Sequence, residues 1–348
     1  MKKNITIKDI AEIAGVSITT VSRVLNNNHW VSEKTKAKVD KVIKEHNFSP
    51  NLVARGMISK KTHMLAVVVS DITNPYFVML VEQIEKVCLV AGYKVILFDT
   101  QSANKSAESV VANIDESIFN SVINSQLDGV IILGGDIDYI TIPERYLSAL
   151  KHLIETIPAV IVGRKIPELE YPCIVRNQTQ SVELVTAHLL EKGYRNIAFA
   201  GGSEKVYMTR QRVNTFKKQL TAAGLVADDD LIVLNNFYLR HGYQAAEQLL
   251  KKGSKRPDAI LAINDQVAAG VIRALKDHQL NVPEDIAVAS CEYFPGSEYF
   301  IPRITTVDHQ NAKIGQAVIA TILELIEPGT PMVKHPDILP VLVGGESC

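Results

Sequence analysis

The polar side chains best placed to do chemistry lie on one short segment, residues 6–26. When residues 18–26 are placed about 100° apart on a helical wheel, Val21, Val24 and Leu25 share one arc, which must face a core. The opposite arc carries Ile18, Thr19, Ser22, Arg23 and Asn26. Short hydroxyl groups, an amide and one guanidinium can reach phosphates and base edges without steric bulk. This face therefore fits the major groove of DNA, and an ordinary helical hairpin with a polar outer face is the alternative.

The surroundings of that face favour the DNA interpretation. The segment predicts two short helices joined by a tight turn at residues 14–16, and Ser17 is the expected N-cap of the second helix, whose N–H groups can meet a phosphate. A third helix is predicted over residues 32–45, and three helices make a small rigid core. Residues 1–62 carry 12 Lys or Arg and 5 Asp or Glu, a net charge of +7, whereas the remainder carries 25 and 33, a net charge of −8. The positive charge thus lies at the end that predicts DNA binding.

Short motifs in this segment match one known family. They are T-I-K-D-I-A at 6–11, A-G-V-S at 14–17, T-V-S-R-V-L-N at 20–26, V-S at 31–32 and F-S-P-N at 48–51. On these motifs the first sixty residues resemble the DNA-binding headpiece of the LacI/GalR family of transcriptional regulators. The similarity continues more loosely to the C-terminus. It implies an all-α helix-turn-helix headpiece followed by a two-lobed α/β domain, like a periplasmic binding protein with doubly wound parallel sheets.

The resemblance also implies which side chains contact DNA. Bases would be read by Ile18, Thr19 and Arg23. Ser17, Thr20, Ser22 and Asn26 would mostly position the helix on phosphates. Thr6 is a further expected DNA contact. A hinge that becomes helical only on operator DNA would contribute Asn51, Ala54, Arg55 and Met57. Met57 stands where the family usually has a leucine wedge for the minor groove, and an apolar wedge unstacks a base step. Gly56 costs about 1 kcal/mol in a helix interior, so weaker hinge ordering is expected.

From Met64 onward the hydrophobic pattern changes to alternating strands and helices. Apolar runs occur at 64–69, 93–98, 128–133, 158–163, 196–202, 259–263 and 285–290, separated by stretches of helical period. Continuous Val/Ile runs between amphipathic helices predict parallel sheets covered on both faces. About 285 residues are too many for one core and predict two lobes, with a ligand crevice at the strand ends.

These patterns predict three parts of the chain. They are a helix-turn-helix domain at 1–50, a hinge helix or linker at 51–62, and an effector-binding and dimerisation domain at 63–348. Within the third part, the first lobe is expected at about 63–162 plus 292–323, and the second at about 163–291 plus 324–348.

Polar and aromatic residues near the predicted strand ends are candidates for effector binding. They are Ser70, Asp71, Tyr76, Phe77, Arg164, Arg176, Arg212, Asn264, Asp265, Glu292 and His309. Tyr76 and Phe77 lie in a segment resembling the family's N-P-[FY]-[FY] turn, where they either stack on a sugar ring or cap the lobe. Arg212 resembles the arginine of the family's R-x-x-G-F segment, which grips the effector; its alternative is a surface salt bridge. Asn264 and Asp265 match the family's N-D-x motif, and their side chains suit hydroxyl groups.

Other cleft positions depart from the family pattern. Arg176 and Asn177 stand where an acid–amide pair is common, and Glu292 stands where Asp is frequent. With Arg164 and Arg212, the crevice would be rich in positive charge. From charge alone, the effector is expected to be anionic, such as a sugar phosphate.

Several function classes receive no support from the sequence. Cys88, Cys173, Cys291 and Cys348 are scattered and have no metal-binding spacing, which predicts reduced thiols in a cytoplasm. No metal and no cofactor are expected. No nucleophile elbow, phosphate loop or Ser/His/Asp arrangement stands out, so an enzyme is not expected. No apolar signal region precedes the first helix, and no apolar run reaches membrane-spanning length.

Two functions remain. The favoured one is a ligand-responsive transcriptional regulator, preferably a repressor of a carbohydrate-utilisation operon, with a sugar or sugar-phosphate effector. The alternative is a sugar-binding or sugar-processing protein of the same fold in which the headpiece is not the main output. A regulator of this type would bind a near-palindromic operator as a homodimer, because a two-fold protein matches two-fold DNA. The tail after Pro340 has no leucine heptad, which favours a dimer over a tetramer.

Overall fold

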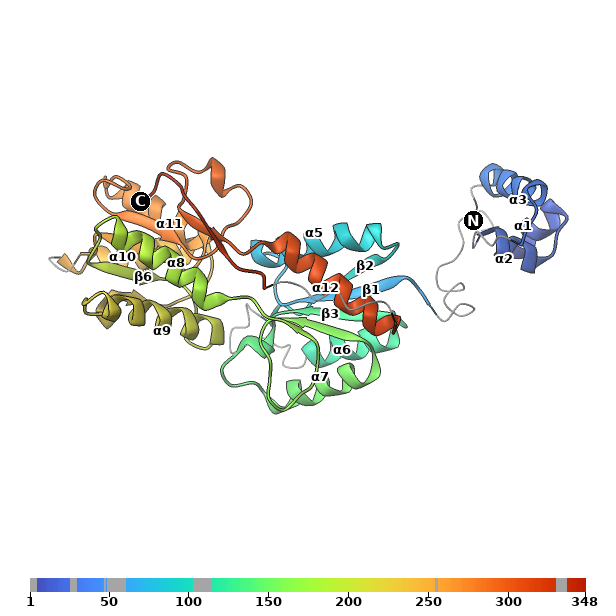
Figure 1. Ribbon diagram of the computed structural model, residues 1–348, viewed down its shortest axis with the longest axis horizontal. Helices are drawn as coiled ribbons and strands as arrows, with labels where there is room; N and C mark the ends of the chain where they lie inside the picture. The colour runs from blue at the N-terminus through green and yellow to red at the C-terminus, as the bar shows by residue number, and fades with distance from the viewer. Residues whose placement is uncertain are drawn as a thin grey trace. The chain divides into compact units, whose positions relative to one another are not determined.

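The chain forms two compact units, residues 1–62 and 63–348, each described here by itself (Figure 1). The computed structural model describes residues 5–25, 30–46, 48, 61–102, 114–253, 256–329 and 337–348. The first unit is helical, and the second contains two parallel sheets with helices on both faces.

The described residues of the first unit contain three helices, and local capping fixes where they begin and end. They are α1 (Ile7–Ala14), α2 (Ile18–Leu25) and α3 (Glu33–Glu45). Thr6 and Asp9 form a capping box at the start of α1, with Asp9 Oδ2 accepting from Thr6 N at 2.7 Å. Gly15 ends α1 with φ 61°, a left-handed conformation that a side chain would oppose. Val21 and Val24 of α2 are buried against residues of α1 and α3, as the helical wheel predicts.

The first lobe of the larger unit is built on a parallel sheet in the order β2-β1-β3-β4-β5. Its strands are β1 (Met64–Val69), β2 (Lys94–Asp99), β3 (Gly129–Leu133), β4 (Ala159–Val162) and β5 (Cys173–Ile174). Two helices, α5 (Pro75–Val90) and α12 (Asn311–Ile326), share a core with one face of the sheet. The other face is covered by α6 (Ile114–Asn124) and α7 (Glu144–Thr156). Both faces are therefore buried, which explains the continuous apolar runs.

The second lobe repeats this plan with a smaller sheet in the order β7-β6-β8-β9. Its strands are β6 (Ile197–Ala200), β7 (Ile232–Val233), β8 (Ala259–Ala262) and β9 (Ala287–Ser290). Its helices are α8 (Gln178–Glu191), α9 (Tyr207–Ala222), α10 (Leu239–Leu250) and α11 (Asp265–Asp277). The helices pack in pairs, α8 with α9 and α10 with α11 (Figure 1). The pair α10–α11 is close enough to require glycine, because a Cβ on Gly270 would lie 1.9 Å from the carbonyl oxygen of Leu239.

The chain crosses between the lobes later than the expected boundaries. β5 pairs with β4, so residues 163–174 belong to the first lobe rather than the second. Ile304 and Val307 lie in the core of the second lobe, whereas the end of α12 packs on the first. The return is made by β11 (Val341–Val343), which pairs antiparallel with β10 (Thr306–Asp308). These strands have two or three residues each, too few to produce a period that marks their lobe.

Candidate functional site

The outer face of α2 carries the side chains that the sequence predicts for DNA. Ile18, Thr19 and Arg23 are exposed, whereas Ser22 is half-buried. Ser17 is exposed and caps α2, because its Oγ accepts from the backbone N–H of Thr20 at 3.1 Å. Thr6 is exposed and Thr20 is half-buried. The other predicted DNA contacts lie outside the described residues; they are Asn26, Asn51, Ala54, Arg55 and Met57.

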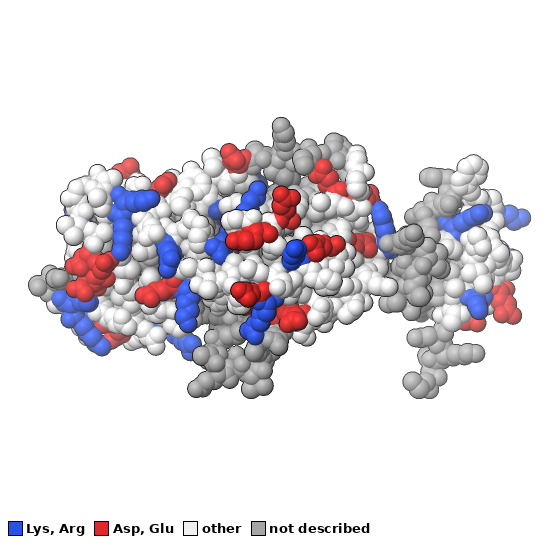
Figure 2. Space-filling view, turned by 90° about the horizontal axis from the view of Figure 1, so that it is seen from below, with Lys and Arg blue, Asp and Glu red and all other residues white. Residues whose placement is uncertain are grey.

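Charged residues are distributed differently on the larger unit. On the face seen in Figure 2, lysine and arginine side chains alternate with acidic ones over the surface of residues 63–348. Interspersed charges of both signs attract a polyanion less than a one-sign patch does. In the first unit, α3 packs against α1 and α2 and carries four exposed lysines; they are Lys34, Lys38, Lys41 and Lys44.

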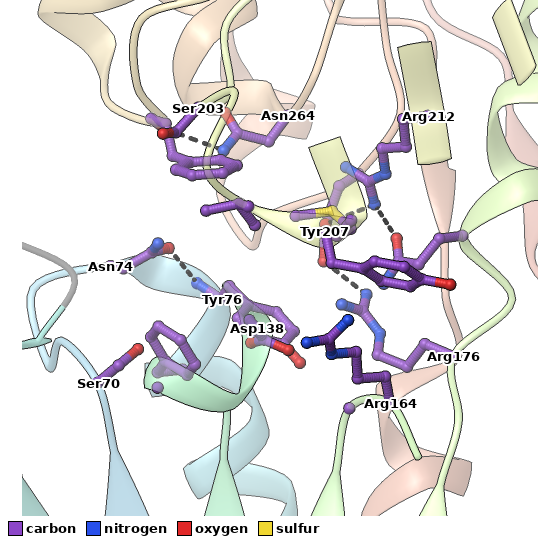
Figure 3. A pocket seen from close by; sticks show the side chains of 18 of the residues that line it. Ser70, Asn74, Tyr76, Asp138, Arg164, Arg176, Ser203, Tyr207, Arg212 and Asn264 are labelled. Atoms are coloured by element: carbon purple, nitrogen blue, oxygen red, sulfur yellow. Dashed lines mark hydrogen bonds and ion pairs between the residues drawn. The ribbon is translucent and has the colours of Figure 1, made fainter. Parts of the chain in front are cut away.

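The two parallel sheets of the larger unit end at one pocket of about 220 Å³ (Figure 3). Residues that follow each of the nine parallel strands in the described part of the chain contribute to its lining, which is the position expected of a ligand site in an open α/β sheet. The starts of α5, α8 and α9 complete it. Eight of the predicted effector residues line this pocket; they are Ser70, Tyr76, Phe77, Arg164, Arg176, Arg212, Asn264 and Glu292.

A buried ion-paired cluster forms one wall. Glu292 Oε1 accepts from Arg176 Nη2 at 2.5 Å, and Glu292 Oε2 accepts from Arg212 Nη2 at 3.0 Å. The three side chains are at most 6% exposed. Burial alone would raise the pKa of Glu292, but the two guanidinium groups lower it to about 2. Arg212 is fully buried, so the alternative of a surface salt bridge is wrong for this residue.

The arginines are also held by groups other than Glu292. Arg212 Nη1 donates to the carbonyl oxygen of Ile263 at 2.6 Å. The guanidinium of Arg176 lies 4.5 Å from the ring centre of Tyr76, a cation–π contact. Arg164 donates to two backbone carbonyls, at 2.8 and 2.7 Å, and its guanidinium lies 4.5 Å from the ring centre of Tyr207. The positive charge expected around the crevice is present and is engaged only in part, because Arg176 Nε and Arg212 Nε are buried without a hydrogen-bond partner among the described residues.

Three predicted effector residues do not line the pocket. Asp265 accepts from Thr306 Oγ1 at 2.7 Å and from the backbone N–H of Phe294 at 3.0 Å, so it holds the segment that carries Glu292. His309 Nε2 lies 3.1 Å from the carbonyl oxygen of Cys291. Burial, with a smaller contribution from Arg176, lowers the pKa of His309 to about 3, which keeps this imidazole neutral. These contacts place both residues behind the pocket wall.

The third, Asp71, is part of a set of contacts that join the two lobes. Its carboxylate accepts a hydrogen bond from the hydroxyl of Tyr238, which follows β7 in the second lobe. The backbone N–H of Ile140 in the first lobe donates to the carbonyl oxygen of Lys205 in the second at 2.9 Å. Arg164 and Tyr207 face each other across the same gap. The structure therefore shows a closed arrangement of the lobes.

Sequence reasoning missed several residues that line the pocket. Asp138, Tyr207, Asn236 and Tyr238 lie in loops or first helical turns that match none of the quoted motifs. Their positions shortly after strand ends could have indicated them, because the carboxyl ends of parallel strands meet at one edge of a sheet.

Comparison with known proteins decides the family. Residues 6–51 match the model for bacterial regulatory proteins of the lacI family, and residues 186–348 match that for a periplasmic binding protein-like domain. Catabolite control protein A of Staphylococcus xylosus is 33% identical over 305 residues, which are 87% of this chain and 87% of that protein. The chain belongs to the lacI family.

Two further relatives extend the similarity over the whole lacI-family chain. The ribose operon repressor of Escherichia coli K12 is 29% identical and covers 97% of this chain and 98% of that protein. A crystal structure of the lac repressor dimer bound to operator and the anti-inducer ONPF is 26% identical, with a TM-score of 0.83 and 99% of each chain covered. The predicted fold, a helix-turn-helix headpiece followed by two α/β lobes, is confirmed.

Membership in the lacI family settles the choice between the two functions predicted from the sequence. The protein is a DNA-binding transcriptional regulator with an effector-binding domain, and the sugar-processing alternative has no support among these relatives. No helix within the described residues has the length and apolar character needed to cross a membrane. No cluster of three or more potential metal ligands occurs in the part of the chain that the structure describes.

Proposed function

We propose that this lacI-family regulator is a repressor that binds a near-palindromic operator as a homodimer and responds to a small carbohydrate in its cleft. The observation that carries the proposal is the pocket lined by both lobes and closed by contacts across them. A ligand there favours one lobe arrangement. It can change the affinity for DNA only by as much as its own affinity differs between the two lobe arrangements. Because β1 begins two residues after the expected hinge at 51–62, a change of lobe angle is transmitted covalently to the hinge.

On the DNA side, we propose the contacts that the family resemblance implies. Ile18, Thr19 and Arg23 on the outer face of α2 would read base edges, which is supported by their exposure. The exposed apolar side chain of Ile18 suits a thymine methyl group. The residues of the expected hinge at 51–57 would make the remaining contacts with DNA. The ribose operon repressor among the relatives supports a carbohydrate operon as the target.

A homodimer is supported by apolar side chains exposed on the first lobe. Leu89 and Val90 at the end of α5 are 68% and 90% exposed, and Ile96 and Leu97 on the edge strand β2 are 36% and 39% exposed. Exposed apolar side chains near an open sheet edge mark an association surface. The lac repressor structure, which is a dimer, supports the same assembly here.

We also propose that the pocket binds its ligand without catalysing a reaction. Glu292 is held ionised with a pKa of about 2, so it does not exchange a proton at neutral pH. The buried His309 has a pKa of about 3 and does not line the pocket. The named relatives are repressors or control proteins, which supports a binding role.

The test is a gel shift on a palindromic duplex selected from a random pool by repeated binding to the full-length protein. Wild-type protein is expected to bind this duplex in a salt-dependent manner and to discriminate against random DNA. Arg23→Ala is expected to lose discrimination by about 10- to 100-fold, because a bidentate base contact contributes about 1–3 kcal/mol.

Lys41→Ala is the matched control, because Lys41 is exposed on α3 and pairs with Glu45 at 3.8 Å. It is expected to weaken binding to all sequences equally or not at all. If Arg23→Ala reduces the affinity for operator and for random DNA by the same factor, Arg23 contacts phosphate only. No shift of any duplex by the wild-type protein contradicts the proposed function as a whole.

A further inference from the structure

Trp30 is the only tryptophan of the chain, and it lies on the surface of the headpiece at residues 1–62. Its side chain is 88% exposed. The headpiece core is built without it, from aliphatic side chains of α1, α2 and α3. Tryptophan is highly buried on average, because its large apolar surface is unfavourable in water. An exposed tryptophan is therefore typical of a surface that another molecule covers.

The residues that follow Trp30 fix its place in the headpiece. Val31 packs against the headpiece core. Ser32 caps α3, because its Oγ accepts from the backbone N–H of Thr35 at 3.3 Å. Trp30 thus precedes two anchored residues, while its own ring lies in solvent. Its exposure belongs to a held segment of backbone and not to a chain end.

Trp30 also lies close to the helix that is predicted to enter the major groove. α2 ends at Leu25, five residues before Trp30, and five residues of extended chain span at most about 18 Å. The major groove is about 12 Å wide, and an α-helix with its side chains is about 10–12 Å across. Because α2 would fill the groove that it enters, no room is left there for an indole ring. The DNA surface within reach of Trp30 is the sugar–phosphate backbone beside that groove.

Positive charge surrounds this part of the headpiece. α3 begins three residues after Trp30 and presents Lys34 and Lys38 as exposed side chains. A Cβ on Gly15 would lie 3.4 Å from Lys38 Nζ, so this ammonium group lies at the turn between α1 and α2. Glu33 is the nearest acidic residue in the sequence, and residues 1–62 carry a net charge of +7. An aromatic ring among basic side chains fits a polyanion, whereas an apolar partner would have to desolvate the lysines.

We propose that Trp30 is a positioning residue for operator binding, with its indole ring packed against the sugar–phosphate backbone that borders the groove occupied by α2. This inference rests on the proposed function, because it requires the headpiece to bind duplex DNA. Sugars and phosphates repeat at every step of a duplex, so the contact orients α2 and adds affinity without reading sequence. The ring carries no charge, so binding is expected to depend on salt equally with and without it.

The fluorescence of Trp30 tests this contact in the unmodified full-length protein, because no other tryptophan contributes. Saturating operator duplex is expected to shift the emission maximum and to shield the ring from quenching by acrylamide. Random duplex at low salt is expected to do the same, since the contact does not read sequence. Emission and quenching that are identical with and without saturating operator overturn the proposal. Shielding that rises with protein concentration in the absence of DNA shows a contact between protein chains and also overturns it.

Gel shifts of two variants measure what the ring contributes. Trp30→Ala is expected to weaken binding to operator and to random DNA by the same factor, about tenfold, with an unchanged salt dependence. Trp30→Phe keeps an aromatic ring and is expected to recover most of this loss. Both variants are expected to unfold at the wild-type temperature, because the ring lies outside the headpiece core. Val226→Ala is the matched control, since Val226 is also 88% exposed but lies in the larger unit, and it is expected to leave DNA affinity unchanged.

Two results with Trp30→Ala contradict the proposal. One is wild-type affinity for both duplexes, and the other is a loss confined to operator, which would make Trp30 a base-reading residue. Failure of the wild-type protein to shift any duplex contradicts the proposed function itself. Operator binding that leaves the fluorescence of Trp30 unchanged contradicts this inference alone.

Discussion

Glu292 is the residue on which the pocket wall depends. It carries the single negative charge that contacts Arg176 and Arg212, and these two arginines are at most 5% exposed. Such contacts could not be predicted from the sequence, because Glu292 lies 116 residues from Arg176 and 80 from Arg212. The sequence did predict that these residues meet at strand ends. It did not predict that Glu292 pairs with two of the arginines, and the anionic effector expected from the arginine count stays a prediction.

Glu292→Gln is therefore expected to destabilise the effector domain. Removing one member of a buried ion-paired group leaves the remaining charges uncompensated, which costs about 3–5 kcal/mol. The measurement is thermal or urea unfolding at pH 7.5. Glu346→Gln removes the partner of Arg303 in a pair whose side chains are more than half exposed, and it is expected to change stability much less than Glu292→Gln does. Equal effects of the two substitutions contradict this account of the cluster.

The same cluster predicts how stability depends on pH. The pKa of Glu292 is about 2 in the folded state and about 4.3 when unfolded, so its contribution is present above pH 4.3 and is lost as the pH falls towards 2. His309, with a folded pKa of about 3 against about 6.5 unfolded, lowers stability as the pH falls from 6.5 to 3. Asp138 has a raised pKa of about 6 in the folded state, so its protonation increases stability as the pH falls below 6. The difference between wild type and Glu292→Gln reports the Glu292 contribution, which is expected to vanish as the pH falls below about 2.

At the scale of elements, the strands and helices were largely predictable and the connections were not. The apolar runs mark β1 and β3 because these strands are buried on both faces. The outer face of α2 was predictable because a helical period is local. β5, β10 and β11 were missed because their pairing is long-range and each has three residues or fewer. Asp138 was missed because one turn of 3-10 helix leaves no periodic signal.

The closed cleft depends on the loop after β7, which brings Tyr238 to Asp71 at the end of β1. Tyr238→Phe keeps the ring and removes one hydrogen bond between the lobes. It is expected to favour open arrangements and to weaken binding of a cleft ligand by about tenfold or more, since a hydrogen bond to a charged group contributes about 1.5–3 kcal/mol. Calorimetry measures the affinity, and small-angle scattering of the ligand-free protein measures the opening.

Tyr243→Phe is the control for this prediction. The hydroxyl of Tyr243 donates to Asp277 at 3.3 Å within the second lobe and does not face the pocket. This substitution is expected to leave both the scattering profile and the affinity unchanged. If Tyr238→Phe weakens binding without any opening of the ligand-free protein, Tyr238 acts as a ligand contact and does not hold the lobes together.

For the whole molecule, a headpiece at 1–62 and a two-lobed body at 63–348 can regulate transcription only if their binding equilibria are coupled. Linkage requires the coupling to be reciprocal: if a sugar changes operator affinity by some factor, saturating operator must change sugar affinity by the same factor. Couplings of this kind are typically about 5- to 150-fold. The sign of the coupling free energy distinguishes an inducer from a corepressor. The protein's affinity for an inducer falls when operator is bound, and its affinity for a corepressor rises.

This prediction is tested by titrating one sugar into the protein with and without saturating operator, and by measuring operator affinity with and without that sugar. The two ratios are expected to agree within error for wild type. Arg23→Ala on random DNA should show a ratio near one, because a headpiece that does not engage operator has no preferred lobe arrangement to impose.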